Sequence, residues 1–285
     1  LISLLSQLDK ILNESKPEVV VIVGWAEKSY NLAHLLCQRR KIPTVIISDS
    51  RLKDHKRHAL KEWFKSQILS GHSSALVAGK ESKEYLVKLG FPKHLIRQPW
   101  DVVDNNYFIR ESKKYTHKEN PHFLYVGRFI EKKNILGLIE SYSIYQDNGG
   151  NWDLKLVGTG QQKSLIVSMI ENIPFPSKVS IHPFQQLNEL ACTYTKASAF
   201  ILPSHLDQWG LVVNEAMASN LPCLVSDGCG CCIDLIKHRE TGWKFNPRDK
   251  KGLANLLLEV QTQKKEDRIG MIDKAKEKIN TFTID

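Results

Sequence analysis

Short apolar runs alternate along the chain with stretches whose apolar residues recur every three or four positions. After an initial helical pattern, the first part contains three β-branched runs, at residues 17–24, 43–49 and 74–79, each followed by a predicted helix. The first run ends at a glycine and is predicted to be a buried strand. Strands that alternate with helices favour a parallel sheet with crossover connections.

The alternation lapses between about residues 105 and 121, where the chain is polar and charged and ends at a proline. This composition is typical of a linker or hinge. The pattern then resumes, with predicted strands at residues 122–128, 153–158, 178–184, 198–204 and 222–227 and a final helical run rich in Lys and Glu. We therefore predict an α/β protein with one domain over residues 1–108, a linker over 109–121 and a second domain over 122–285.

The composition suits packed globular domains, with 42% hydrophobic and 25% charged residues in a chain of 285. No apolar run approaches the roughly eighteen residues that a membrane-spanning helix needs. The six cysteines do not form the framework of a small disulfide-rich domain, which favours a cytoplasmic location. A net charge of +9 indicates an anionic partner, such as a phosphate ester, a nucleic acid or an acidic membrane surface.

Both ends of the chain are expected to be clipped. The sequence starts inside an amphipathic helical pattern, with Leu1 in place of an initiating Met, and it stops where a further segment begins. The N-terminal domain is therefore expected to be incomplete.

Candidate ligand groups follow the predicted strands of the second domain, where doubly wound sheets bind their ligands. Gly127 and Arg128 close one strand, and Lys133 lies five residues further on. Arg offers a planar fork for phosphate oxygens and Lys a mobile charge, although solvated surface cations would give the same pattern. The GTG turn that ends at Gly160 closes the next strand and is by itself a weak signal. The segment HPFQQL, residues 182–187, closes a third strand, and its backbone could lie beside a flat base.

The segment DQWGLVVNEAMASNLP, residues 207–222, places two carboxylates eight positions apart across the predicted start of a helix. Asp207 lies in the loop, Gly210 lets the backbone approach a ligand, and the N–H groups of a first helical turn form an anion site. Glu215 lies about one turn deeper in an apolar stretch, so its carboxylate is expected to face a polar group. The alternative is a helix cap at Asp207 and an exposed acid at Glu215.

This segment resembles the motif of two glutamates, separated by seven residues, of the retaining glycosyltransferases of family 4. The family has Glu, any residue, Phe, Gly and a second Glu, where this chain has Asp207, Gln208, Trp209, Gly210 and Glu215. Further segments resemble the family in the same order, namely VGRFIEKKN, VGTG, ILPS, AMASNLPCLVSDGCG and ETGWKF. The resemblance implies the GT-B fold, in which two Rossmann-like domains with parallel sheets face a central cleft.

The resemblance also implies a role for the matched residues. Glu215 corresponds to the carboxylate that binds the ribose hydroxyls of a nucleotide diphosphate sugar, the donor. Arg128 and Lys133 correspond to ligands of its diphosphate, and Asp207 to the catalytic residue at the donor sugar, with a side chain one methylene shorter. The resemblance assigns four more residues to the donor site: Gly127, Gly160, Gly210 and Leu211.

The implied chemistry is consistent with these residue types. Cleavage of a sugar–diphosphate bond builds negative charge on the leaving oxygen, which fixed cations and a helix N-terminus stabilise. The sequence has no Asp-x-Asp pair, so Arg128 and Lys133 are expected to replace a metal, and no cofactor is expected. The resemblance implies a retaining hexosyltransferase that acts on a hydroxyl of a glycan or a lipid-linked acceptor. The alternative is a non-catalytic protein that binds anions or nucleic acid on the same fold.

The first domain resembles the family more loosely. The family places a His after the strand at residues 43–49, and here Asp49 lies nearest to that position, with a catalytic role or a turn cap as the two alternatives. Residues 39–65 carry nine Lys or Arg against three acids, with Trp63 and Phe64 among them. On a helical projection the apolar and basic positions interleave, so a solvated basic face is the default. Contact with anionic lipid at the inner face of the membrane is the alternative, and no nucleic acid partner is expected because no such motif is present.

Three cysteines stand close together in the second domain, at Cys229, Cys231 and Cys232. Zinc sites favour two to four residues between cysteines, so this spacing is too tight for the usual arrangement. We expect no metal there, and interpret the segment as a loop of small residues beside the donor site.

Overall fold

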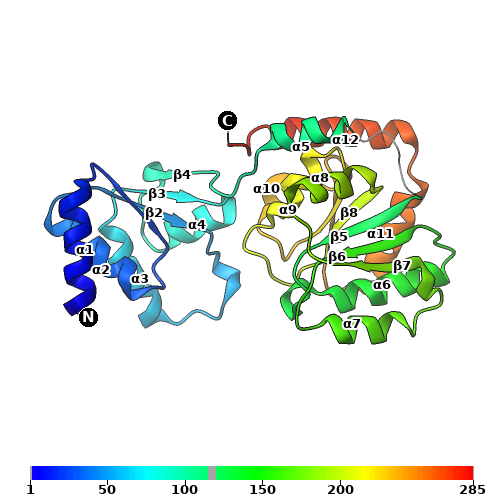
Figure 1. Ribbon diagram of the computed structural model, residues 1–285, viewed down its shortest axis with the longest axis horizontal. Coiled ribbons are helices and arrows are strands. Elements are labelled where there is room, and N and C mark those ends of the chain that lie inside the picture. The colour runs from blue at the N-terminus through cyan, green and yellow to red at the C-terminus, as the bar shows by residue number, and fades with distance from the viewer. Residues whose placement is uncertain (1, 115–119, 285) are drawn as a thin grey trace. The chain divides into compact units, whose positions relative to one another are not determined.

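The computed structural model describes residues 2–114 and 120–284 of the chain. The chain divides into two compact units, unit 1 over Leu1–Asp101 and unit 2 over Val102–Asp285, each with its own parallel sheet (Figure 1). Within the described ranges, no helix combines the length and the apolar character that crossing a membrane requires. The predicted α/β class with two parallel sheets is confirmed.

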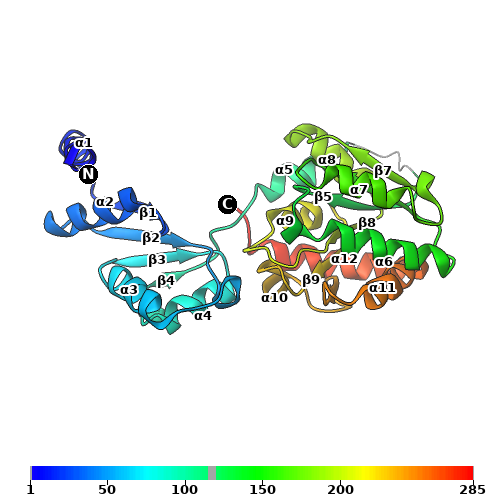
Figure 2. The same cartoon turned by 90° about the horizontal axis from the view of Figure 1, so that it is seen from below.

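Unit 1 contains a four-stranded sheet in the order β1-β2-β3-β4 (Figure 2). Its elements are α1 (Ile2–Ser15), β1 (Val20–Val23), α2 (Lys28–Arg39), β2 (Thr44–Ser48), η1 (Leu52–Asp54), α3 (Ala59–Ser70), β3 (Ser74–Val77), α4 (Lys80–Lys88), η2 (Lys93–Leu95) and β4 (Ile96–Arg97). The three predicted strands are present. A buried cluster joins the sheet to α3 and α4 through Ile46, Leu69 and Leu86.

Strand β1 is less buried than predicted. It lies at the edge of the sheet and pairs with β2, and the side chains of Val21 and Val23 are 55% and 58% exposed, whereas Ile22 is buried. A run of β-branched residues does not distinguish a strand covered on both faces from an edge strand with one open face. The prediction of a buried strand was therefore wrong for Val21 and Val23.

Unit 1 also buries two histidines against each other. The rings of His34 and His72 stack with centroids 3.8 Å apart and planes 18° apart, and Nδ1 of His34 lies 3.1 Å from Oγ1 of Thr44. Burial lowers the pKa of His34 and lowers the pKa of His72 to about 3. Both imidazoles are therefore neutral near pH 7, because the folded unit offers no solvent to a charged ring.

Unit 2 contains a six-stranded parallel sheet in the order β10-β9-β8-β5-β6-β7. Its elements are α5 (Asn105–Ser112), β5 (His122–Val126), η3 (Glu131–Lys133), α6 (Ile135–Asp147), β6 (Asp153–Val157), α7 (Lys163–Ile170), η4 (Pro176–Lys178), β7 (Val179–His182), α8 (Leu187–Lys196), β8 (Ala199–Leu202), α9 (Leu211–Ala218), β9 (Cys223–Ser226), α10 (Cys231–Leu235), β10 (Trp243–Phe245), α11 (Lys250–Thr262) and α12 (Lys265–Ile279).

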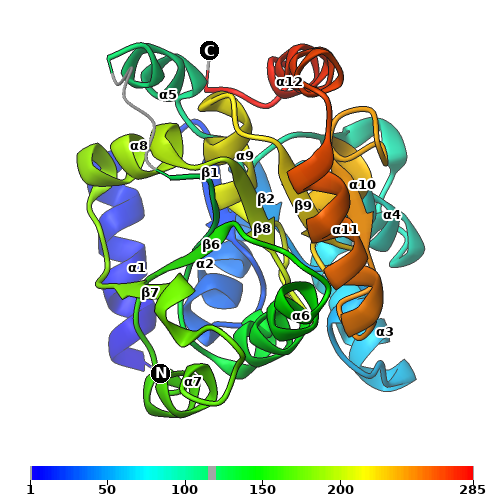
Figure 3. The same ribbon diagram turned by 90° about the vertical axis from the view of Figure 1, so that its right-hand side faces the viewer.

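Helices cover both faces of the unit 2 sheet. α6, α7 and α11 pack together on one face, and α5, α8, α9 and α12 lie on the other (Figures 1 and 3). Every residue of β5 and β8 is buried, as expected for central strands covered on both sides. The strand order changes direction between β5 and β8, and such a switch point is where doubly wound sheets bind ligands.

The division between the units lies earlier than predicted. The chain divides after Asp101, whereas the sequence placed the end of the first domain at residue 108 and a linker at 109–121. Asp104 caps α5 by accepting a hydrogen bond of 2.8 Å from the backbone N–H of Tyr107, and Phe108 is buried against Tyr194. The polar composition conceals this short helix because only one of its faces is buried. Residues 115–119 of the predicted linker lie outside the described residues.

The end of unit 2 contains more elements than the single helical run that the sequence predicted. After β9 the chain forms α10, adds the short parallel strand β10 to the edge of the sheet, and finishes with two helices, α11 and α12. A three-residue strand gives too short a pattern for a period of two to be seen.

Candidate functional site

The loops after β5 and β6 form one platform at the carboxyl edge of the unit 2 sheet. The backbone N–H of Gly127 donates to Val157 O at 3.0 Å, and that of Phe129 donates to Thr159 O at 2.8 Å. A Cβ atom on Gly160 would lie 2.4 Å from Phe129 O, so only glycine permits this approach. The two loops are thereby locked together, and Arg128 is exposed at their edge.

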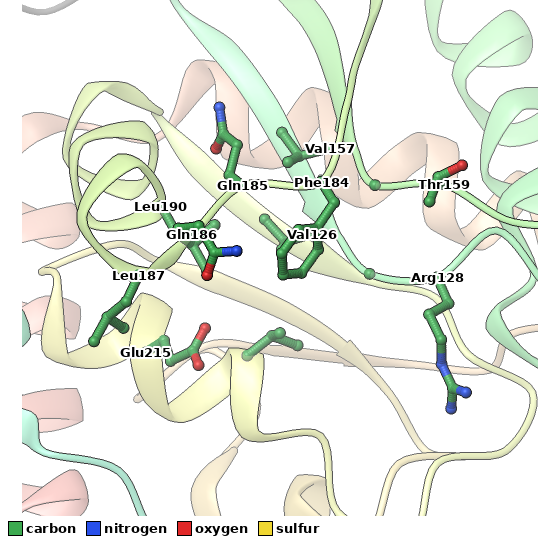
Figure 4. Close-up of a pocket in the computed structure, with 13 residues that line it drawn as sticks. Val126, Arg128, Val157, Thr159, Phe184, Gln185, Gln186, Leu187, Leu190 and Glu215 are labelled. Atoms are coloured by element: carbon green, nitrogen blue, oxygen red, sulfur yellow. The ribbon is translucent and has the colours of Figure 1, made fainter.

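A cavity of about 350 Å³ opens beside this platform. It is lined by residues 126–128, 157–159 and 184–187, with Leu190 of α8 and Val212 and Glu215 of α9. Figure 4 shows Glu215 and Arg128 on opposite sides of Phe184 and Val126. The cavity therefore offers a carboxylate at one end, a guanidinium at the other and an apolar wall between them.

Glu215 faces both the cavity and a buried phenol. The hydroxyl of Tyr194 on α8 donates a hydrogen bond of 2.8 Å to Oε2 of Glu215. Burial raises the pKa of Glu215, and the bond from Tyr194 opposes this increase. Burial also raises the pKa of Tyr194, so the phenol remains a donor. The expectation that this carboxylate faces a polar group is confirmed.

The second carboxylate forms an ion pair with the second predicted cation. Nζ of Lys133, in η3, contacts Oδ2 of Asp207, and the two side chains are only 12% and 11% exposed. Neither residue lines the cavity itself. The hydroxyl of Tyr125 donates to Arg128 O at 3.1 Å, and the nearby charge of Asp207 contributes, after burial, to raising the pKa of this tyrosine. The Lys133–Asp207 pair therefore lies close to the Arg128 end of the cavity.

Buried Asn134 fixes the geometry of the loop that carries Lys133. Its side-chain Nδ2 donates to Pro203 O at 3.0 Å and to Pro247 O at 2.9 Å. It thus connects the loops after β5, β8 and β10. Its place at the predicted start of a helix was the one indication of Asn134 in the sequence.

Helix α9 begins where the sequence predicted. Gly210 adopts a φ of +104° at the N-cap, and a Cβ atom there would lie 2.8 Å from Cδ2 of Leu202. Leu211 is the first helical residue and is exposed. Trp209 does not face the cavity: it is buried, and its ring stacks on Phe282 with centroids 5.5 Å apart.

Asp49 belongs to unit 1, where it follows β2 and has an exposed side chain. Its carbonyl oxygen accepts a hydrogen bond of 2.9 Å from Oγ of Ser82. The structure brings Gly127, Arg128 and Glu215 together in one cavity, whereas Asp49 is described within its own unit only. Its catalytic role stays a prediction.

The segment with three cysteines lies directly beside Asp207. The backbone N–H of Gly230 donates to Asp207 O at 2.9 Å, and Cys229, Cys231 and Cys232 are buried. Burial, reinforced by the charge of Asp207, raises the pKa of the Cys229 thiol to about 12. Among residues 2–114 and 120–284, no group of three or more His, Cys, Asp or Glu side chains could hold a metal ion. The interpretation as a small-residue loop beside the site agrees with this placement.

Tyr194, which donates a hydrogen bond to Glu215, was not predicted from the sequence as part of the site. It lies at an apolar position of α8, where a tyrosine is typical of the core, and its partner follows 21 residues later. The available signal was indirect, since a glutamate within an apolar helix requires a polar neighbour. Phe184 and Leu187 of the cavity wall lie in the segment of residues 182–187 whose backbone was expected beside a base, whereas Leu190 was not assigned.

Comparisons with known proteins identify the family of this chain. The family model for glycosyl transferases group 1 matches residues 108–278. The chain is 26% identical over 234 residues to the amylovoran biosynthesis glycosyltransferase AmsK of Erwinia amylovora, covering 79% of this chain and 57% of the relative. It is 32% identical over 165 residues to the O-antigen chain mannosyltransferase RfbU of Salmonella typhimurium, covering 57% of this chain and 43% of the relative. The chain thus spans about half the length of these relatives.

Solved structures share the fold. A glycosyltransferase from Rickettsia africae superposes with a TM-score of 0.80 at 15% identity, covering 99% of this chain and 77% of that protein. HepE of Anabaena, solved in complex with UDP, superposes with a TM-score of 0.79 at 14% identity, covering 97% and 78%. The fold is therefore that of the GT-B glycosyltransferases. Since the family model covers more than half of its residues, this chain belongs to the glycosyl transferases group 1 family.

Proposed function

We propose that this chain transfers a hexose from a nucleotide diphosphate sugar to a hydroxyl of a glycan or lipid-linked acceptor, with retention of configuration and without a metal. The observation that carries the proposal is the cavity with Glu215 at one end and Arg128 at the other. A nucleotide has the complementary polarity, because its ribose hydroxyls donate to a carboxylate and its phosphates accept from a guanidinium.

The chemistry requires stabilisation of the leaving diphosphate. Arg128 and Lys133 supply positive charge near the same edge of the sheet, and the N-terminus of α9 adds the partial charge of its N–H groups. Such fixed groups stabilise developing charge without having to reorganise. Asp207 beside Lys133 is proposed to contact the transferred sugar, and Asp49 to act on the acceptor side.

The ligands of structural neighbours support the class of donor. HepE of Anabaena has been solved with UDP-glucose, and TarM of Staphylococcus aureus with UDP, alpha-GlcNAc-glycerol and fondaparinux. Those ligands belong to those proteins, and we extend only their class, a nucleotide diphosphate sugar and a glycan acceptor, to this chain. A cytoplasmic location with peripheral contact to an anionic membrane belongs to the same proposal.

The test is a thermal-shift panel of UDP-, GDP- and ADP-sugars with and without EDTA. A donor at 100 times its Kd should add about 2.7 kcal/mol of stability, and EDTA should not remove the shift. Product analysis by NMR should then show that the anomeric configuration of the donor is kept. No shift with any nucleotide sugar, or inversion of the product, would contradict the proposal.

Arg128→Ala sharpens this test. It should weaken a nucleoside diphosphate far more than the bare nucleoside, because the guanidinium is proposed to contact phosphate. Arg110→Ala, which removes an exposed arginine on α5, serves as the matched control and should leave both affinities unchanged. Equal losses for the two ligands in Arg128→Ala would mean that Arg128 does not act on the phosphates.

A further inference from the structure

We propose that unit 1 docks on an anionic lipid bilayer through a docking face formed by Leu60, Trp63 and Phe64 of α3 with the flanking Lys56 and Lys61. The proposal does not depend on the donor chemistry of unit 2, because membrane binding is measured without donor or acceptor. The residues of this docking face are specified here, whereas the proposed function includes only peripheral contact with an anionic membrane.

The apolar part of the docking face is open to solvent. Leu60, Trp63 and Phe64 are 67%, 54% and 55% exposed, and the rings of Trp63 and Phe64 touch edge to face at 4.9 Å between centroids. Their spacing of three and four residues places them on one side of α3. Leu69, the one residue of α3 that is buried among those described, lies on the opposite side. The helix therefore turns its bulkiest side chains away from the core.

Arg57 holds the loop before α3 in place. Arg57 lies over the ring of Tyr85 at 4.3 Å, and its Nη1 donates to the hydroxyl of Tyr85 at 2.8 Å. Its Nε donates to Leu52 O at 3.0 Å. Because these contacts tie the loop to α4, Lys56 is presented at the N-terminal end of α3 by a fixed backbone.

The exposed charge around the docking face is positive. Lys56 and Lys61 are exposed. The two acids of residues 52–65 are paired within the protein: Asp54 is buried against Arg51 at 2.9 Å, and Glu62 pairs with Lys65 at 2.9 Å. The surface thus shows apolar side chains together with unopposed lysines.

Exposed apolar side chains beside lysines fit the surface of a lipid bilayer better than they fit a protein or a nucleic acid. Tryptophan and phenylalanine side chains are suited to the headgroup region, and lysines near an anionic leaflet add electrostatic attraction. Three apolar side chains on a twelve-residue helix are typical of reversible peripheral binding, with no span required. The helical projection alone could not show this, because it did not reveal which side of α3 is buried.

The test is flotation of the full chain with phosphatidylcholine vesicles with and without phosphatidylglycerol. Binding is expected only with phosphatidylglycerol and should fall as salt rises. Trp63→Ser/Phe64→Ser and Lys56→Glu/Lys61→Glu should each lower the partition coefficient by roughly tenfold or more. The matched controls, Leu165→Ser/Phe175→Ser and Lys265→Glu/Lys274→Glu, change equally exposed residues of unit 2 and should leave binding unchanged.

Two further readouts decide the outcome. Brominated acyl chains should quench the fluorescence of the chain, and the quenching should disappear in Trp63→Phe. Failure to bind anionic vesicles, or equal binding by the Trp63→Ser/Phe64→Ser variant, would overturn the proposal. So would loss of duplex DNA binding in the lysine variant with unchanged vesicle binding, which would assign the surface to nucleic acid. Nucleotide affinity in the same variants tests folding and the proposed function separately.

Discussion

The hydroxyl of Tyr194 donates a 2.8 Å hydrogen bond to Oε2 of Glu215 from a ring that is completely buried. This contact joins α8 to α9 and holds a carboxylate of raised pKa at one end of the cavity. Among the described residues it is the one hydrogen bond found for the Glu215 side chain, which leaves the other carboxylate oxygen for a ligand.

Tyr194→Phe should therefore weaken the donor without unfolding the chain. The bond is worth about 1.5 kcal/mol or more and orients the Glu215 carboxylate in the free chain as well as in the complex, so its loss should raise Kd by up to about tenfold. Isothermal titration with the nucleoside diphosphate measures it. Tyr142→Phe is the matched control, because it removes a buried hydroxyl that donates to Trp152 O at 2.8 Å outside the cavity. Equal losses in both variants would show a general effect on folding.

The two carboxylates of the site should respond differently to neutralisation. Glu215→Gln should weaken the bare nucleoside diphosphate by at least about tenfold, because the carboxylate is proposed to accept two ribose hydroxyls. Asp207→Asn should leave that affinity unchanged or increase it, since Lys133 loses its competing partner. Transfer should nevertheless fall by about tenfold or more, because Asp207 is proposed to contact the sugar.

Titration calorimetry with the diphosphate and a transfer assay with the full donor separate these effects. Asp147→Asn, at the exposed end of α6, is the control for a lost carboxylate. If Asp207→Asn and Glu215→Gln weaken binding of the diphosphate to the same extent, the two carboxylates do not have the separate roles proposed for them.

Donor affinity should fall on acidification. The fall should begin at a higher pH than it would for a glutamate with an ordinary pKa. Burial raises the pKa of Glu215 above the usual 4.5, so protonation begins earlier on acidification. The protonated acid has no charge and one fewer acceptor for the ribose hydroxyls. A series of Kd values against pH should show this decline in the wild-type chain and not in Glu215→Gln. An identical decline in both chains would assign it to another group.

Stability of unit 1 should also decrease on acidification, through its paired histidines. The pKa of His72 is lowered to about 3 in the folded chain, so the unfolded chain takes up a proton near pH 6.5 that the folded chain refuses. The full stability is present above pH 6.5 and is lost as pH falls, by about 1.4 kcal/mol per pH unit for each such group.

Chemical denaturation at pH 7.5 and 5.5 measures this loss as a change in the free energy of unfolding. His72→Phe keeps a ring for stacking on His34 and should flatten the dependence on pH, whereas His94→Gln, an exposed control, should not. An unchanged slope in His72→Phe would show that the stacked pair is not its origin.

Much of the site could be predicted because it depends on local order along the chain. In a parallel sheet the carboxyl ends of all strands meet at one edge, so Arg128, Gly160 and Gly210 were expected near each other from their places after strands. The positive φ of Gly210 and the start of α9 followed from the same local pattern. Segments that depend on few residues, such as β10 and α5, were missed.

The sequence by itself determined the alternation of strands and helices, the two parallel sheets and the residues that follow each strand. Only the tertiary structure decided the ion pair of Lys133 with Asp207, the bond from Tyr194 to Glu215, and the exposed side of α3. The physical reason is the range of the interactions. Backbone periodicity and glycine geometry act over a few residues, whereas burial and pairing depend on side chains that approach from distant parts of the chain, 74 positions away in the case of Lys133 and Asp207.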